Sequence, residues 1–336
     1  MKKKKTASKT LVSVSVMAAV TAATMGVAFA APDWSKVPSR KVTVLYPGNS
    51  GLEWVMKGTD HSGARAVKGG ETCAGCHDKE AADIGKKIVS GEKLDSKPIK
   101  GKAGSIPVTV QAAHDANNLY LRFQWKAPAG GGPKMDTTNQ VKLTVMLDAG
   151  NVEYAAQGTC WATCHNDMRS MDDANDAAAK KHAKSSALGW DDGVTKYIKE
   201  SRTEISLKEK PRGGWDKLKP DAEIAAALKE GKFLDLIQYR SGGAPIDGYV
   251  LDSRHMSGGK SLVSAEGSQS GGNWTVTFTR KLAAGGVGDH AITAGKLYHI
   301  GFAIHDDHAN ARYHQVSLGH TLGLNNASAE INAVKQ

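Results

Sequence analysis

Apolar and polar residues alternate regularly in several stretches of the chain. In LYLRFQW, residues 119–125, large apolar side chains occupy every second position. That period is typical of a β-strand that buries one of its two faces. The turn-forming sequence DANN separates the strand from an earlier apolar stretch. The two stretches, residues 106–115 and 117–128, are therefore predicted to pair as a hairpin.

Further strand candidates follow the same pattern between clusters of glycine, asparagine and aspartate. With the hairpin, they cover residues 41–48, 106–115, 117–128, 140–150, 233–241, 247–254, 273–280, 297–306 and 312–319. These short strands predict a mainly β fold, a β-sandwich with helical and loop insertions. Helices are expected at residues 79–92, ending near Gly91, and at 172–184 and 221–230 within a polar insertion.

The first 30 residues have three parts. A basic MKKKKTASKT is followed by an apolar stretch that ends in Ala28-Phe29-Ala30. This order, with small residues before the cleavage point, is typical of a secretory signal peptide that is removed near Ala30. No later segment approaches the ~20 apolar residues that span a bilayer. We therefore expect an exported, periplasmic protein with no transmembrane segment in its mature chain.

The charge of the chain argues against one class of partner. The formal net charge of +10 includes five lysines of the first 30 residues, so the remaining 306 residues carry about +5. Acidic and basic residues are interspersed, and basic clusters after residue 30 are no larger than pairs such as Lys86-Lys87. This pattern is typical of a solvated, mildly basic surface, and nucleic acid is not expected as a partner.

Four cysteines form two close pairs, and a histidine directly follows each pair. The first pair is CAGCH, with Cys73, Cys76 and His77, which is the attachment motif of c-type haem. Two thiols at this spacing bond to the haem vinyl groups, and the adjoining imidazole reaches the iron. A redox disulfide would be expected in a βαβ pattern, and a zinc ion would need two more ligands. Covalent haem is therefore the preferred interpretation.

The second pair has one more residue between its cysteines. In CWATCH, Cys160 and Cys164 are separated by three residues, and His165 follows, whereas the usual haem motif has two. The order of thiol, loop, thiol and histidine is kept, which favours a second haem. A structural zinc ion would lack two ligands. A Cys160–Cys164 disulfide, which an exported protein permits, remains the main alternative.

Each haem of an electron carrier needs a second axial ligand. His61 lies twelve residues before Cys73 on a glycine-containing segment, and it is the candidate for the first haem. His305 and His308, in IHDDH, are candidates for the second haem. They could instead form a polar turn between strands, or a divalent-metal site with the two aspartates between them.

Three segments carry a resemblance to a known family. They are GCHDKEAADIG, CWATCHNDMRSM and GFAIHDDHANARYHQVSLGHTLG. Through the last two, roughly residues 100–325 resemble the ethylbenzene dehydrogenase-related haem-binding proteins, a family with cytochrome c-552-like members. The family also includes b-haem subunits of periplasmic molybdenum enzymes of the dimethyl sulfoxide reductase type. The resemblance implies a haem at one end of an immunoglobulin-like β-sandwich.

The resemblance also bears on the axial ligands. The b-haem members use a methionine and a lysine, and this chain departs from both. CWATCH with His165 lies near the methionine position, and His314 in ARYHQVSLG lies near the lysine position. The resemblance therefore implies that a second covalent haem is held by His165 and His314.

These interpretations divide the chain into a signal peptide (1–30), an N-terminal haem c segment (31–100), a β-sandwich with the second haem (101–325) and a tail (326–336). The expected function is electron transfer by a dihaem c-type cytochrome, with two covalently bound haem c groups, between a respiratory donor and a terminal reductase or dehydrogenase. Its expected partners are a quinol-linked donor, other cytochromes or a molybdenum oxidoreductase. The alternatives are a dihaem peroxidase or oxyanion reductase with one open iron, and a haem subunit of a molybdenum-enzyme complex.

Overall fold

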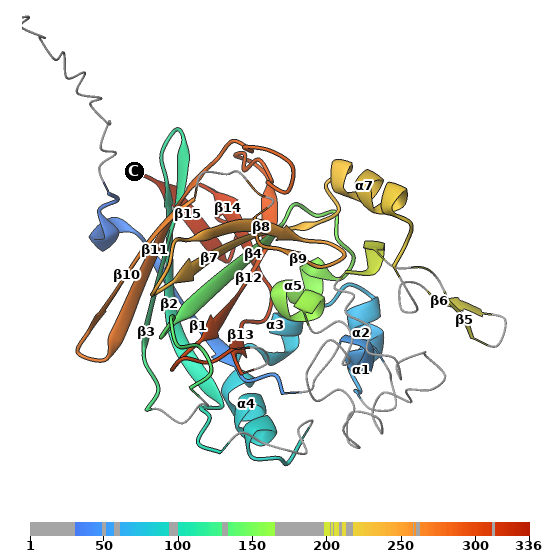
Figure 1. The fold of residues 1–336 in the computed structure, drawn as a ribbon, viewed down its shortest axis with the longest axis horizontal. Helices are drawn as coiled ribbons and strands as arrows, with labels where there is room; N and C mark the ends of the chain where they lie inside the picture. The colour runs from blue at the N-terminus through green and yellow to red at the C-terminus, as the bar shows by residue number, and fades with distance from the viewer. Residues whose placement is uncertain are drawn as a thin grey trace, which may run out of the picture. The chain divides into compact units, whose positions relative to one another are not determined.

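Hydrogen bonds join thirteen of the described strands into one sheet (Figure 1). The structure is a computed structural model that describes residues 31–48, 52–56, 61–93, 100–129, 134–164, 198–201, 203, 205–207, 210–212, 218–257, 259, 263–310 and 313–336. Residues 32–336 form one unit, separate from residues 1–31. The strands of the sheet are β1 (Ser39–Leu45), β2 (Ser105–His114), β3 (Asn118–Lys126), β4 (Lys142–Asp148), β7 (Leu234–Arg240), β8 (Ile246–Val250), β9 (Arg254–His255), β10 (Ser264–Ser270), β11 (Asn273–Lys281), β12 (Leu297–His305), β13 (Gln315–Val316), β14 (His320–Leu324) and β15 (Ile331–Lys335). β5 (Ile205–Leu207) and β6 (Lys210–Arg212) pair with each other apart from it.

The sheet has two halves that are joined at their edges. One half has the strand order β10-β11-β3-β2-β1, and the other has the order β13-β12-β4-β7-β8-β9. β1 pairs with β13, and β15 pairs with both β2 and β14. An apolar core contains side chains from both halves. Phe123 of β3 shows this, because its ring lies 6.1 Å from that of Phe278 and 5.0 Å from that of Phe302, centroid to centroid.

The predicted hairpin of β2 and β3 is confirmed, with antiparallel pairing along both strands. Its turn is held by the Asp115 carboxylate, which accepts hydrogen bonds of 2.7 Å from the backbone N–H groups of Asn117 and Asn118. The hydroxyl of Tyr120 donates to the same carboxylate at 2.7 Å. These bonds lower the pKa of Asp115 to about 2, although burial acts against them. An aspartate side chain that bonds backbone two or three residues ahead is a common way to fix a turn.

The mainly β fold predicted from the sequence is confirmed, and an immunoglobulin-like arrangement stays a prediction. The expected strand at residues 312–319 is shorter, since only Gln315–Val316 pairs as a strand. β10 was not predicted because its sequence, SAEGSQS, lacks apolar alternation, and most of its residues are exposed. Backbone pairing with β11 accounts for it. β14 and β15 were also not predicted, and β15 lies in the expected C-terminal tail.

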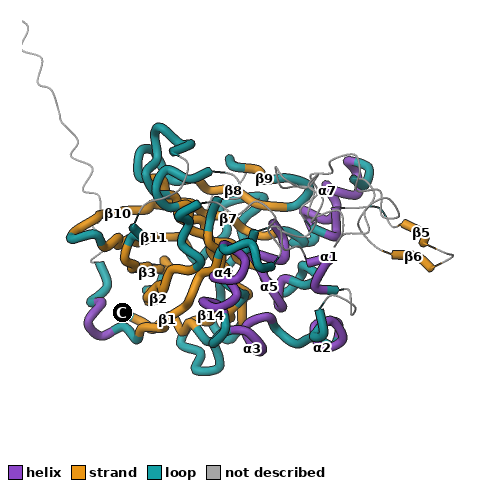
Figure 2. Tube along the Cα trace, turned by 90° about the horizontal axis from the view of Figure 1, so that it is seen from below, coloured by secondary structure: helices purple, strands orange, loops and turns teal. Residues whose placement is uncertain are grey.

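Short helices gather beside the sheet, as Figures 1 and 2 show from perpendicular directions. Among the described helices, none combines the length and the apolar composition that a membrane crossing requires. Two of the expected helices are confirmed, at residues 81–89 and 221–229, and the one at 172–184 lies outside the described residues. The helices are α1 (Leu52–Val55), α2 (Ala64–Lys68), α3 (Cys73–His77), α4 (Ala81–Val89), α5 (Ala155–Cys164) and α7 (Asp221–Lys229), with 3₁₀ turns η1 (Trp34–Lys36) and η5 (Lys199–Ser201).

Helix α4 packs closely against the start of β2 and against β1. Its buried residues Ala81 and Ile88 contact Leu45 and Tyr46 at the end of β1. Gly85 allows the close approach, because a Cβ atom on this residue would lie 2.0 Å from the carbonyl oxygen of Gly104. This packing fixes α4 next to α3, which precedes it directly in the chain.

Candidate functional site

Helix α3 presents the first cysteine motif on a single turn and a half of helix. Thr72 caps its N-terminus, since the hydroxyl accepts a hydrogen bond of 2.9 Å from the backbone N–H of Gly75. Residues three apart on a helix lie on the same face, so the thiols of Cys73 and Cys76 share one side of α3. Both cysteines carry free thiols. The local sequence therefore positions two thiols and the following His77 together.

A largely apolar cavity of about 390 Å³ opens beside α3. This volume lies within the range of roughly 300–1,000 Å³ that is usual for cofactor pockets. Cys73, Cys76 and His77 line one part of it, and His61 lines another. The exposed side chains of Lys87 and Lys93 also reach it. Its apolar lining comes mainly from Leu45, Val55, Val67, Ile84, Ile88 and Leu318.

The imidazole rings of His61 and His77 lie close together at this cavity. Their centroids are 6.0 Å apart, and the ring planes are inclined by 49°. Two imidazoles on opposite sides of one metal ion, each bonded at ~2 Å, have centroids roughly 6 Å apart. The pair therefore has the separation that a haem iron between the two rings requires.

Hydrogen bonds determine which nitrogen of each ring can bind iron. Nδ1 of His61 lies 3.1 Å from the carbonyl oxygen of Val55, and Nδ1 of His77 lies 3.0 Å from Oε2 of Glu80. Both partners only accept, so each Nδ1 carries the hydrogen and each Nε2 carries the lone pair. Iron-binding histidines are usually oriented in this way, by a carbonyl or carboxylate behind the ring.

The protonation states at the cavity also suit a neutral ligand set. Burial lowers the pKa of His61, and the nearby His77 lowers it further, although the bond to Val55 acts in the opposite direction. His61 is therefore neutral at pH 7, as an iron ligand must be. Burial raises the pKa of the Cys73 thiol to about 11, because the thiolate would lose its hydration.

The second cysteine motif lies on helix α5, which packs on β12 and β4. The helix is kinked at Thr159, where the backbone has a φ of 37°. Cys160 is buried directly after this kink. Gly301 of β12 permits the contact, since a Cβ atom there would lie 2.9 Å from the Cβ atom of Cys160. Cys164 ends the helix, but its side chain and all of His165 lie outside the described residues.

The two cysteine motifs adjoin each other, which the sequence did not predict. Helices α3 and α5 are in contact, and a Cβ atom on Gly158 would lie 3.6 Å from Sγ of Cys73. Trp161, between the two cysteines of the second motif, lines the cavity beside α3. The order of residues along the chain does not reveal this contact between α3 and α5, because the contact depends on how both helices pack on the sheet.

His305 and His314 lie side by side at the end of the β12–β13 ladder. Ala303 pairs with Val316 and Ile304 with Gln315, so the next residues outward are His305 and His314. Ala303 and Val316 belong to the apolar cluster that also contains Cys73, Cys160 and Trp161. Since alternate residues of a strand share a face, both histidines belong to the sheet face that the cysteine motifs cover.

The two rings are too close together to bind opposite sides of one iron. Their centroids are 4.7 Å apart, with planes inclined by 34°, against the roughly 6 Å that such an arrangement needs. Either histidine alone could bind a metal, with the other beside it. The structure thus brings His314 and His305 together but does not distinguish them as ligands.

His308 has a defined place in the turn after β12. Its Nδ1 lies 2.7 Å from the carbonyl oxygen of Asp136. Its own carbonyl accepts hydrogen bonds from the backbone N–H groups of Met135 and Asp136. Asp307 and His308 both have positive φ values, of 54° and 61°. These contacts hold residues 135–140 against the turn, and its role as an iron ligand stays a prediction.

Two titratable groups lie close to the His305–His314 pair, the half-buried Lys102 and the buried Asp306. Lys102 donates a hydrogen bond of 2.9 Å to the carbonyl oxygen of Tyr313. Burial lowers the pKa of Lys102 to about 8, against the effect of Asp306 and Asp307. Burial likewise raises the pKa of Asp306 to about 6, against the effect of Lys102. This region is therefore much more polar than the cavity beside α3.

Comparison with known proteins supplies a family. The ethylbenzene dehydrogenase family profile matches residues 31–317. Cytochrome c-552 of Stutzerimonas stutzeri is 46% identical over 98% of this chain and 99% of its own. Cytochrome c-551 of Rhodocyclus tenuis is 32% identical over 91% of this chain and 100% of its own. Among solved structures, a family 9 carbohydrate-binding module from Caldicellulosiruptor kristjanssonii, in complex with glucose, matches with 9% identity and a TM-score of 0.29, covering 66% of this chain and 70% of its own.

Proposed function

Because the chain belongs to the ethylbenzene dehydrogenase family, we propose that it is an electron-carrying cytochrome c with covalent haem in the cavity beside α3. Two full-length relatives named as cytochromes c support this. The haem would be attached through Cys73 and Cys76, and the bound haem would supply an iron that takes up and releases one electron. The chain itself supplies the apolar surroundings and the two axial imidazoles.

The observation that carries the proposal is the 6.0 Å separation of the His61 and His77 rings. This separation supports a pair of axial ligands beside the two thiols, because it matches two imidazoles bonded to one iron. Outward hydrogen bonds to Val55 and Glu80 hold both rings in this orientation. A fixed pair of ligands keeps the structural change on reduction small, which favours electron transfer over catalysis at this haem.

The proposal includes a second covalent haem, attached through Cys160 and Cys164. His165 would bind its iron from the motif, and His314 would bind from the opposite side, with His305 as the competing candidate. Contact between α3 and α5 supports this arrangement, because it places the second attachment segment beside the first. Two adjoining haems would give electrons a short route through the protein.

We further propose that the mature protein is periplasmic and begins near Ala31. Its partners would be a quinol-linked donor or another cytochrome on one side, and a terminal reductase, dehydrogenase or molybdenum oxidoreductase on the other. The exposed Lys87 and Lys93 at the cavity support a docking surface for an acidic redox partner. The two joined halves of the sheet, with a shared core, support the immunoglobulin-like β-sandwich as the fold.

The test is a haem count on the purified mature protein. A pyridine-haemochrome assay is expected to give two covalent haems per chain. One haem per chain, together with a Cys160–Cys164 disulfide in peptide mass mapping, would contradict the second site. No covalent haem would contradict the whole proposal.

Carbon monoxide distinguishes a carrier from an enzyme. A carrier with two closed irons does not bind carbon monoxide readily after reduction, and its oxidised form gives only low-spin electron paramagnetic resonance signals. A dihaem peroxidase or reductase would bind it at one haem. The close His305–His314 pair makes the second haem the place where such an open position would be found.

A further inference from the structure

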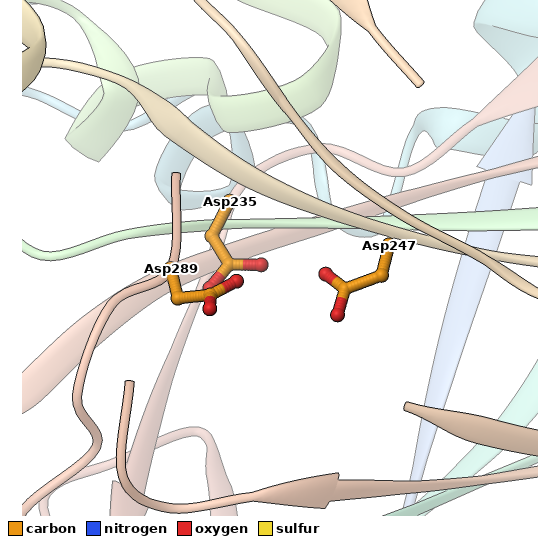
Figure 3. A group of neighbouring side chains, drawn as sticks. All are labelled: Asp235, Asp247 and Asp289. Atoms are coloured by element: carbon orange, nitrogen blue, oxygen red, sulfur yellow. The ribbon is translucent and has the colours of Figure 1, made fainter. Parts of the chain in front are cut away.

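Three aspartates from separate segments meet on the core side of the sheet (Figure 3). Asp235 lies on β7 and Asp247 on β8, where Ile237 pairs with Asp247, so the two aspartates are diagonal neighbours on one face. Asp289 comes from the loop between β11 and β12. The amino-acid sequence gives no sign of this group, because its members are far apart in the chain and two lie within predicted strands.

The carboxylates are close enough to share one ion. One oxygen from each residue can be chosen so that all three lie within 4.8 Å of one another. Oxygen ligands on opposite sides of one calcium ion are about 5 Å apart, so three oxygens within 4.8 Å of one another can surround a single calcium ion. Magnesium usually keeps several waters and takes only one or two carboxylates, so a group of three carboxylates suits calcium better.

One oxygen of Asp235 lacks a protein partner. The Asp235 side chain is fully buried, and its Oδ2 accepts hydrogen bonds from Arg280 and from the backbone N–H of His290. Among the described residues, no hydrogen-bond donor reaches Oδ1 of Asp235. A buried carboxylate oxygen without a partner costs free energy, and a cation bound among the three carboxylates would remove that cost.

The charge of the group also suits a cation. The buried guanidinium of Arg280 pairs with one of the three carboxylates, that of Asp235. Arg280 is directed toward Oδ2 of Asp235 and the carbonyl oxygen of His290. A cation bound among the three carboxylates would be held by their negative charge.

We propose that Asp235, Asp247 and Asp289 bind one calcium ion. Oxygen-only ligation is the kind that calcium prefers, and zinc or copper would favour nitrogen and sulfur ligands. Gly259 lies against the same group, since a Cβ atom there would be 2.3 Å from Oδ1 of Asp247 and 2.8 Å from Oδ1 of Asp289. A side chain at residue 259 would fill this space.

The ion would fasten the β11–β12 loop to the sheet beneath the haem segments. Asp235 faces the core, while its neighbours Leu234 and Leu236 face the opposite side and belong to the apolar cluster with Cys73 and Cys160. His290, next to Asp289, stacks on Phe233 with ring centroids 4.2 Å apart. Calcium would thus connect the loop to the strands that support both cysteine motifs, without touching either haem site.

The experiment compares two variants of the mature, haem-loaded protein. Asp247→Asn keeps the shape of a half-buried ligand but removes its charge, and Glu266→Gln removes one exposed carboxylate on β10 as the matched control. After treatment with EGTA, 2 mM calcium should raise the Tm of the unmodified protein by about 3–6 °C, for a Kd of ~100 µM. Glu266→Gln should show the same Tm shift as the unmodified protein. Asp247→Asn should bind calcium at least about tenfold more weakly and therefore show a smaller Tm shift.

Metal content gives an independent measure. Equilibrium dialysis followed by elemental analysis should find one calcium per chain in the unmodified protein and in Glu266→Gln. If the Tm does not change with calcium and no calcium is retained, the proposal is wrong. The three carboxyl groups would then be stabilised by protonation and not by a metal ion. Full calcium binding by Asp247→Asn would also overturn it, because the ion would then lie elsewhere. An equal response to magnesium would overturn the choice of calcium. Asp289→Asn serves as the second variant if Asp247→Asn does not fold.

Discussion

The two histidine pairs differ in how the chain holds them. His61 lies just before α2 and His77 ends α3, and the two have outward hydrogen bonds and a 6.0 Å ring separation. His305 and His314 are neighbours at the end of a strand pair, with rings 4.7 Å apart. The ring separation of His61 and His77 matches that of two ligands on opposite sides of one iron. The rings of His305 and His314 are closer, so only one of them could bind an iron while the other lies beside it. Histidine content alone would not distinguish these arrangements.

Their surroundings differ as well. Apolar side chains line the cavity beside α3, and its lysines are exposed. The half-buried Lys102 and the buried Asp306 lie near the other pair. An apolar environment stabilises the redox state of a haem that has the lower net charge. Nearby charged side chains shift the relative stability of the oxidised and reduced states according to the sign of their charge. We therefore expect the two proposed haems to differ in reduction potential, which would give electron flow a direction.

The largest expected effect comes from removing the ligand that each motif supplies. His77→Ala should lower the haem content from two to about one per chain, because the attached haem loses its proximal ligand. The measurement is the pyridine-haemochrome assay on purified protein. His255→Ala is the matched control, since His255 lies 2.7 Å from the carboxylate of Asp252, and it should keep both haems.

The corresponding change in the second motif is His165→Ala. It should disturb the second haem and leave the spectrum of the first largely intact. Contact between α3 and α5 makes this a strict test of separability. Unchanged spectra of both haems in either alanine variant would show that the assigned proximal ligand is wrong.

A smaller effect is expected at the distal position of the first haem. His61→Ala should keep the covalent haem but leave an iron that binds about one carbon monoxide per chain after reduction. His61→Met should restore a low-spin iron and raise its potential by on the order of 0.1 V, because methionine favours the reduced state. His255→Ala is a suitable control, since His255 is held by Asp252 at 2.7 Å. A low-spin iron in His61→Ala would show that another residue is the ligand.

The second pair yields a sharper test through its asymmetry. The 4.7 Å separation allows one iron ligand, so His314→Ala and His305→Ala should differ. We expect His314→Ala to open the second haem to carbon monoxide, while His305→Ala changes its potential or spectrum only slightly. The reverse result would make His305 the ligand. If neither variant binds carbon monoxide, the ligand lies outside this pair.

The sequence predicted those parts of the molecule that depend on local pattern. Alternating residues predicted β2 and β3, and the spacing of Cys73, Cys76 and His77 predicted a short attachment segment. His61 could be proposed because it is near in sequence. The contact of Gly158 with Cys73 and the aspartate group were not predictable, since both depend on segments that only the folded sheet brings together.

β10 shows a second limit of pattern analysis. Its exposed residues carry no apolar periodicity, so only its backbone bonds to β11 make it a strand. The place of His314 beside His305 is similar, because the β12–β13 register decides it. Resemblance to a family indicated His314, but the geometry of its neighbour could come only from the structure.

The smallest expected effect concerns the hydrogen bond behind His77. Glu80 accepts this bond at 3.0 Å and is largely exposed, so solvent screens it. A carboxylate behind the ring makes the imidazole a stronger donor and stabilises oxidised iron. Glu80→Gln should therefore raise the potential of the first haem by ~20–40 mV, or ~0.5–1 kcal/mol, without loss of haem. Asp83→Asn on α4 removes the same charge without that bond, and it measures the purely electrostatic part in a redox titration. Equal shifts in both variants would show that the Glu80 bond has no specific effect, and a shift at the second haem alone would contradict the assignment of His77 to the first.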